Sequence, residues 1–326
     1  MIDKHFIFVL FLIMTTAVTN SVWADAKDTT SVNADSLKAW KFSSTIYSGL
    51  NQIGFVNWAA GGESSLSGKV GVYYKLNYKK NKFRFLNEVK LAYGLVGYVD
   101  KRVEKTDDKI DILTTFGLTN NSKWITTGLI TYKSQFAPGY KYPDDSTMIS
   151  TFMAPGYLTL SMGMNYKPNK IFQMFLSPVS GKFTFVLNQE LANRGSFGVA
   201  KAITDTAGNI IVPGKNYKGE LGINIVTSLH KELMKNINVN TTLNLFNNYI
   251  DPNRANRWNI DIDWDTHFVF KINKIFSTIL FFHMKYDDDS KTAKYGVDDL
   301  GEKVLLWEKP MLQIKESLGL SVTLKI

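Results

Sequence analysis

Apolar and polar residues alternate along most of the chain between Lys41 and Ile326. In the final segment, for example, Leu318, Leu320 and Val322 are each separated by one small or polar residue. Because successive side chains of a strand point to opposite faces, this period of two predicts β-strands. The predicted strands lie at roughly 42–55, 65–78, 83–99, 109–119, 124–136, 155–166, 171–187, 217–229, 236–250, 257–271, 275–287 and 308–326.

The lengths of the strands and of their connections predict one closed sheet. Several strands have about ten or more residues, which is the length that a tilted membrane crossing requires. Short connections such as 79–82 and 167–170 alternate with long ones at 100–108, 137–154, 188–216 and 288–307. We therefore expect an all-β protein, a single antiparallel transmembrane β-barrel of about twelve strands, with fourteen as the alternative, long outer loops and short inner turns.

The charge of the chain follows the same division into two rims. Lys and Arg number 38 against 29 Asp and Glu, and the net charge is +9. The short turns are strongly basic, with Glu232 their only acid, whereas the long loops carry acidic runs such as 287–289. This positive balance fits a rim beside anionic lipid headgroups better than a nucleic-acid surface. The absence of cysteine excludes a disulfide scaffold, a thiolate metal site and a cysteine nucleophile.

The beginning of the chain predicts export. An apolar run at 6–18 follows a short polar start, and Ala24 is a small residue at the expected cleavage point. Such a run is too short to span a bilayer as a helix and is typical of a signal peptide. We expect a signal peptide at 1–24, a flexible polar lead at 25–40, the barrel at 41–326, and location in the outer membrane.

Charged side chains are expected to point into the barrel. A Lys or Arg that faces lipid at the midplane would cost about 2–4 kcal/mol. The alternation assigns these polar and charged candidates to the lumen: Arg84, Glu88, Lys90, Asp261, Asp263, Asp265, His267, His283, Lys285 and Lys315. Their mixed signs predict either a self-paired network that narrows the pore or a lumen that conducts or binds a ligand.

The last long hairpin allows a prediction of register. If 272–274 is a three-residue connection, Asp263 lies opposite His283 and Asp261 opposite Lys285. Asp265 then faces Phe281 without a cationic partner and leaves a negative spot that favours cations. Aromatic residues beside the short turns predict an interfacial girdle. These are Tyr78, Phe83, Tyr166, Phe172, Phe270 and Phe276.

The sequence contains little sign of catalysis. His267 and His283 are both expected to point inward without an outward serine at their level, and no Gly-x-Ser-x-Gly motif is present. No pair of histidines has metal-ligand spacing on one face, and the acidic run 287–289 does not match a calcium loop. We expect no enzymatic activity, no cofactor and no metal.

Several motifs resemble those of a known family. They are Asn57-Trp58-Ala-Ala-Gly-Gly62, Gln135-Phe-Ala-Pro-Gly-Tyr140, Phe152-Met-Ala-Pro-Gly-Tyr157, Gly163-Met-Asn-Tyr-Lys-Pro-Asn169, Leu176-Ser-Pro-Val-Ser-Gly-Lys182, Tyr286-Asp-Asp288 and Lys315-Glu-Ser-Leu-Gly319. Together they resemble an uncharacterised family, a domain of unknown function, of Bacteroidetes-type secreted proteins understood as outer-membrane barrels. The resemblance runs from about Trp40 to Ile326. It implies the fold and the location, and no activity or catalytic residue.

Three functions are consistent with these features. The first is passage or binding of a small polar solute through a charge-paired lumen. The second is a non-conducting scaffold or assembly partner of the envelope, and the third, remote alternative is an outer-membrane hydrolase. The expected partners are outer-membrane lipid and a small polar solute, without nucleic acid; the protein partners are left open.

Overall fold

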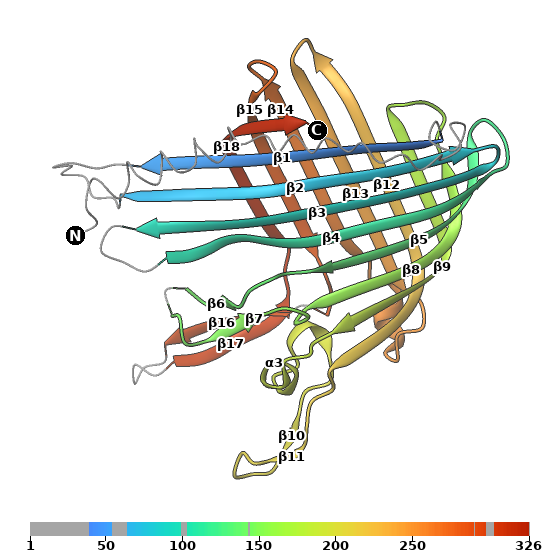
Figure 1. The fold of residues 1–326 in the computed structure, drawn as a ribbon. Coiled ribbons are helices and arrows are strands. Elements are labelled where there is room, and N and C mark those ends of the chain that lie inside the picture. Colours follow the sequence, from blue (N-terminus) through green and yellow to red (C-terminus); the bar gives the residue numbers. More distant parts are fainter. Residues whose placement is uncertain are drawn as a thin grey trace, which may run out of the picture.

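Twelve strands form one closed antiparallel barrel in the computed structural model (Figure 1). The structure describes residues 39–53, 64–98, 103–142, 144–289, 291–297 and 303–325, so the predicted signal peptide and nearly all of the predicted lead lie outside it. The strands of the wall are β1 (Trp40–Ile53), β2 (Ser65–Lys80), β3 (Phe83–Tyr98), β4 (Val103–Thr119), β5 (Trp124–Ser134), β8 (Gly156–Tyr166), β9 (Phe172–Phe185), β12 (Tyr217–Met234), β13 (Ile237–Asn248), β14 (Asp261–Lys271), β15 (Phe276–Tyr286) and β18 (Gln313–Lys325).

Pairing of β1 with β18 closes the barrel, because each strand otherwise pairs with its neighbour in the chain order of the wall. The prediction of a barrel of about twelve strands is therefore confirmed. Closure leaves the wall without an edge strand, so its backbone groups are paired within the sheet. Among the described residues, no helix is long and apolar enough to cross a membrane.

The alternation of the sequence separates the two faces of the wall. On β8, Leu160, Met162 and Met164 are exposed on the outside, whereas Ser161 between them is buried on the inside. The same arrangement leaves large apolar side chains exposed on strands all around the barrel, among them Phe42, Ile46, Val70, Phe116, Ile130, Trp264 and Leu318. An apolar exterior around a polar interior is the arrangement expected of a barrel that faces lipid.

Aromatic rings gather beside the short connections. The ring centroids of Trp40 and Tyr78 are 4.5 Å apart, and those of Trp124 and Tyr166 are 4.6 Å apart. Phe83 is 5.9 Å from Tyr78. We call this end of the barrel the short-turn rim and the opposite end the long-loop rim; rings at this level suit the interface between lipid and water.

Asparagine fixes three connections at the short-turn rim. The side-chain oxygens of Asn121, Asn169 and Asn273 each accept hydrogen bonds from the backbone N–H groups two and three residues further on, at 2.8–3.0 Å. Such a side chain takes the place of a backbone turn. In the structure these asparagines mark where each hairpin reverses.

The predicted register of the last long hairpin is wrong by two residues. Asp265, rather than Asp263, lies opposite His283, and Asp263 lies opposite Lys285. The reason is the Asn273 turn, in which the backbone N–H of Ile272 bonds the carbonyl of Phe276 at 3.0 Å, so that the loop consists of 273–275. Because the shift is even, every side chain stays on its predicted face.

Several strand ends also differ from the prediction. The predicted loop 100–108 is shorter, because β4 begins at Val103 and contains Asp107 and Asp108. Residues 257–260 do not extend β14, since η2 (Arg254–Trp258) is a 3-10 helix. The start of the predicted strand 308–326 belongs instead to a separate hairpin of β16 (Lys291–Val297) and β17 (Lys303–Pro310). The period of two does not distinguish these short hairpins from the wall.

Further small elements lie on the long-loop rim. They are β6 (Gly139–Tyr140) with β7 (Met148–Ser150), α3 (Gln189–Asn193), η1 (Ser196–Gly198), and β10 (Ile203–Thr204) with β11 (Ile210–Val212). The hairpin of β10 and β11 projects away from the wall (Figure 1). Ala154, Val186, Leu191, Ala192 and Val199 form a buried apolar cluster that anchors α3 at this rim.

Candidate functional site: the charged lumen

The inward face of the wall carries the ten candidates predicted from the sequence. Directly paired residues point to the same face of the sheet, as Lys90 does with Asp111 and His283 with Lys315. Several of them contact side chains of strands that are not neighbours in the sheet, which is possible only across the interior. The structure thus directs these side chains into the lumen.

Ion pairs cross the lumen near the long-loop rim. The ammonium of Lys133 on β5 lies 2.8 Å from Asp263 on β14, although β8, β9, β12 and β13 separate these strands. Lys182 on β9 bonds Asp261 at 2.6 Å. The ammonium of Lys315 on β18 lies 3.6 Å from Asp107 on β4. Lysines therefore connect separate parts of the wall across the lumen, and we call these ion pairs the cross-lumen layer.

A histidine completes this layer on β15. The Nε2 of His283 is 2.8 Å from Oδ1 of Asp263 and 3.8 Å from Oδ1 of Asp265. The expectation that Asp265 would face Phe281 is wrong for the reason given above, and Phe281 instead stacks with His267 at 4.5 Å. Asp265 nevertheless lacks a lysine partner among the described residues, and its Oδ1 is buried without a hydrogen bond.

Lys285 takes part through an aromatic ring. Its ammonium lies 5.0 Å from the centroid of Tyr157 on β8, across the lumen from β15. A cation over an aromatic face at this distance is attracted by the negative charge density of the ring. Lys285 also lies 3.9 Å from Asp287, so its charge is shared between the wall and the rim.

The three candidates on β3 make their contacts with adjacent strands. Glu88 pairs with Lys75 on the neighbouring strand at 2.6 Å, and Lys90 lies 6.0 Å from the ring of Tyr73. The Nε of Arg84 donates to Thr119 Oγ1 at 2.8 Å near the short-turn rim. These groups are satisfied by adjacent strands and line the wall without bridging the lumen.

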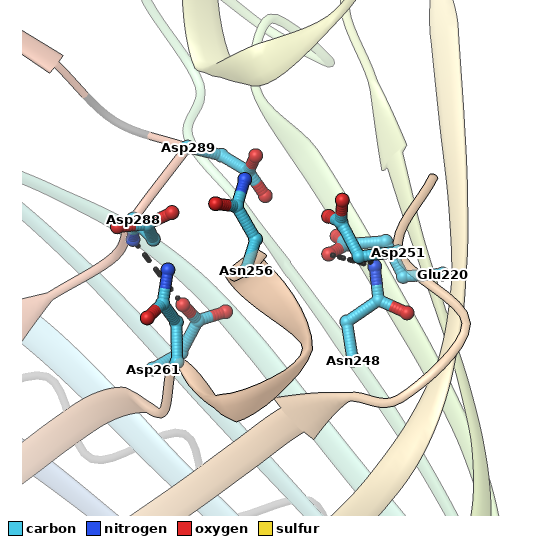
Figure 2. Close-up of a pocket in the computed structure, with 8 residues that line it drawn as sticks. Glu220, Asn248, Asp251, Asn256, Asp261, Asp288 and Asp289 are labelled. Atoms are coloured by element: carbon cyan, nitrogen blue, oxygen red, sulfur yellow. Dashed lines mark hydrogen bonds between the residues drawn. The ribbon is translucent and has the colours of Figure 1, made fainter. Parts of the chain in front are cut away.

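An open pocket lies next to the layer, on the side of the long-loop rim. Figure 2 shows carboxylates and amides that converge from β12, η2, β14 and the segment after β15. Its lining residues are Glu220, Asn248, Asp251, Asn256, Asn259, Asp261, Asp288 and Asp289. Neighbouring lysines offset part of this negative charge. The ammonium of Lys182 lies 3.5 Å and that of Lys218 3.4 Å from the buried carboxylate of Glu220. Sequence reasoning missed the amides and Asp251, whose one signal was a loop rich in Asn and Asp.

Acids outside the strands have lowered pKa values, among them Asp287 and Asp144. Burial alone would raise the pKa of Asp287, but the ammonium groups of Lys182 and Lys285 outweigh this effect and lower it. The pKa of Asp144 is far below its ordinary value because the hydroxyl and N–H of Ser146 and the N–H of Thr147 donate to its carboxylate. Both carboxylates therefore stay charged at neutral pH and lose their partners only as the pH falls below the ordinary aspartate pKa.

One group of side chains in the described residues has metal-ligating atoms close together. The atoms come from Asp263, Asp265 and His283, and all lie within 4.8 Å of one another. The expectation from sequence considered pairs of histidines and did not consider a histidine with two carboxylates on the adjacent strand.

The closed twelve-stranded wall with its apolar outside and charged inside defines the class of transmembrane β-barrels of the outer-membrane type. Residues 50–140 match the model of a family described as a protein of unknown function (DUF3078). This finding agrees with the predicted resemblance to an uncharacterised family. No curated protein matches the chain in sequence.

Solved barrels are similar over most of their length. The NanC porin has 7% identity, with 85% of this chain and 98% of that chain covered, and a TM-score of 0.35. The translocator domain of the autotransporter NalP from Neisseria meningitidis has 9% identity, coverages of 97% and 95%, and a TM-score of 0.33. The toluene transporter TodX of P. putida has 10% identity, coverages of 87% and 79%, and a TM-score of 0.33. Because each TM-score lies below 0.5, we take nothing about lumen or substrate from these barrels.

Proposed function

We propose that the protein is an outer-membrane barrel that passes or binds a small polar solute through its charge-paired lumen. The observation that carries this proposal is the cross-lumen layer, in which Lys133 and Lys182 pair with Asp263 and Asp261 on strands that are not their neighbours in the wall. The interior is therefore occupied by ion pairs, and these can exchange their partners for a polar solute or water.

The surroundings of the layer support the same function. Outside it lies the open acidic and amide-lined pocket, which can receive a solute that carries hydrogen-bond donors or positive charge. On the side of the short-turn rim, small polar side chains such as Thr127, Ser161 and Asn224 line the wall. A solute that replaces one partner of an ion pair at the layer would find further hydrogen-bonding groups on either side.

Conductance in a planar bilayer tests the proposal. The wild type is expected to conduct weakly, and the double variant Lys133→Gln/Asp263→Asn to conduct severalfold more, since it removes both charges of one bridge and keeps polar side chains. The matched control is Lys75→Gln/Glu88→Gln, an ion pair between neighbouring strands whose loss opens no path.

The two variants separate passage from a closed barrel. An unchanged conductance in the control and an increase in the first variant support a constriction formed by the layer. Absence of conductance from the wild type and from both double variants, with the protein folded, would contradict passage.

A second candidate function rests on the hairpin of β10 and β11. Its Ile203, Ile210, Ile211 and Val212 are all exposed on a projection from the long-loop rim. Aliphatic side chains in such a position favour contact with another protein. An envelope scaffold would need this hairpin and would not need an open lumen.

Location and orientation give a further prediction. We expect the protein in the outer-membrane fraction, with the long-loop rim outside the cell. Trypsin added to intact cells should then cut after exposed residues of the loops, such as Lys201 and Lys215, and leave Lys79 and Lys80 at the short-turn rim intact. Peptide mapping of the fragments, with lysed cells as the control, distinguishes this orientation from its inverse, in which only the short turns would be cut.

A further inference from the structure

We infer that Asp263, Asp265 and His283 form a binding site for a divalent transition-metal ion of the zinc type within the lumen. The three side chains offer two carboxylate oxygens and one imidazole nitrogen, a donor set that suits Zn²⁺. The site would exist whether or not the barrel conducts, so it goes beyond the proposed passage.

The distances between the donor atoms fit a metal ion. Two ligands of a tetrahedral zinc ion are roughly 3.4 Å apart when each bond is about 2.1 Å long. Nε2 of His283 lies 2.8 Å from Oδ1 of Asp263 and 3.8 Å from Oδ1 of Asp265, on either side of that value. Shifts of about half an ångström would bring the imidazole to this spacing from each carboxylate, and all three donor atoms already lie within 4.8 Å of one another.

Backbone pairing explains why these atoms meet. Asp265 and His283 are directly opposite each other on β14 and β15, and Asp263 lies two residues away on the same face. Side chains at such positions are about 4.5–5.5 Å apart at Cβ across the ladder. The site is thus built on two rigid strands, which hold ligands more firmly than a loop would.

Unpartnered oxygens supply an independent indication of a cation. Oδ1 of Asp265 is buried without a hydrogen-bond partner, and so is Oδ1 of Asn244, which lies opposite Asp263 on β13. A buried acceptor without a donor is costly, and an ion or an ordered water commonly occupies such a position. Both acceptors lie beside Asp263, where a bound cation would satisfy them.

The neighbouring lysines do not fill this role at Asp265. Lys285 is directed to Tyr157 and Asp287, and Lys315 to Asp107. Lys133 bonds Oδ2 of Asp263 at 2.8 Å and leaves Oδ1 to the site. In this arrangement Lys133 would orient a ligand from outside the coordination shell, as hydrogen-bonding partners of metal ligands usually do.

Titration of the folded full chain, purified without a histidine tag, tests the site. Isothermal titration calorimetry with Zn²⁺ is expected to show one equivalent bound, and His283→Ala and Asp265→Asn each to weaken binding at least tenfold. The controls are His230→Ala at the short-turn rim and Asp205→Asn in the β10–β11 loop, which should bind like the wild type. Co²⁺ added in place of Zn²⁺ should give the visible absorption of a tetrahedral nitrogen and oxygen site, and His283→Ala should lose it.

Other results would overturn the inference. These are the absence of stoichiometric Zn²⁺ binding by the folded wild type, equal affinity for Ca²⁺ or Mg²⁺, and Zn²⁺ binding that His283→Ala leaves unchanged. The heat-dependent mobility of each variant on a gel establishes that it is folded, and His283→Gln serves if the alanine variant is not. A barrel that binds Zn²⁺ but shows no conductance would retain this site and lose the proposed passage.

Discussion

Replacing Gly163 by alanine is expected to lower the yield and the stability of the folded barrel. The loss should exceed that of the same change at Gly156, the other glycine of β8. A Cβ at this position would lie 2.1 Å from the carbonyl oxygen of Leu176 and 2.7 Å from Cα of Ser177. Both obstacles are backbone atoms of β9, so no side-chain rotation relieves the contact. Overpacking of a tight interior costs about 1–3 kcal/mol, and contact with backbone belongs at or above the upper end of that range.

The surrounding structure prevents β9 from moving away. The register between β8 and β9 shifts between Met162 and Met164, which marks a bulge opposite Gly163. The buried hydroxyl of Ser177 lies 2.8 Å from the carbonyl oxygens of both Met162 and Val179 and ties the bulge to β8. A bulge held in this way re-aims the strand and cannot be displaced without loss of these contacts.

Urea unfolding in detergent and the heat-dependent gel mobility measure the effect. Gly128→Ala on the adjacent strand β5 is the matched control, since a Cβ there would have no other atom within 4 Å. The control should unfold at the midpoint of the wild type. Equal midpoints for both variants would show that the bulge is more adaptable than its contacts imply.

Removing the charge of Asp263 is the second change with a large expected effect. Asp263→Asn leaves both Lys133 and His283 without the anion that they share. Breaking a buried ion pair from one side costs about 3–5 kcal/mol, whereas exposed pairs are worth about 0–1 kcal/mol. Because the side chain of Lys133 is 39% exposed and that of Asp263 26%, we expect a loss between these limits.

A double-mutant cycle separates the ion pair from other effects. Lys133→Met in the Asp263→Asn background should cost less than it does alone, with a coupling within the range of about 0.5–3 kcal/mol found for contacting residues. Glu190→Gln is the control, because the ion pair of this α3 residue with Arg194, directly after the helix, is largely exposed and should contribute little. Additive losses for Lys133 and Asp263 would mean that the two groups do not interact in the folded barrel.

The sequence predicted the strands of the wall and their faces better than the register and the strand ends. The error in register left every side chain on its predicted face, since alternation is a local property that a shift by two residues does not change. The register of β14 and β15 was wrong because the Asn273 turn admits loops that begin at either of two residues, and composition does not distinguish them. Asp107 and Asp108 were placed in a loop for a similar reason, as acidic residues are usually solvated and rarely continue a strand.

The contacts inside the lumen depend on the whole barrel and not on the local sequence. Lys133 and Asp263 are 130 residues apart, and nothing near either one in the sequence indicates the other. Their meeting depends on the number of strands in the wall and on the stagger accumulated around it, which together set the diameter and decide which levels face each other. The grouping of His283 with two carboxylates likewise required the exact pairing of two strands.

The sequence by itself determined which side chains face lipid, which face the interior and which rim carries the short turns, because period-two alternation and turn composition act over a few residues. Only the tertiary structure decided which charges neutralise one another across the lumen and which oxygens stay unpaired. Those partners are brought together by closure of the whole sheet, and closure is a property of all twelve strands at once.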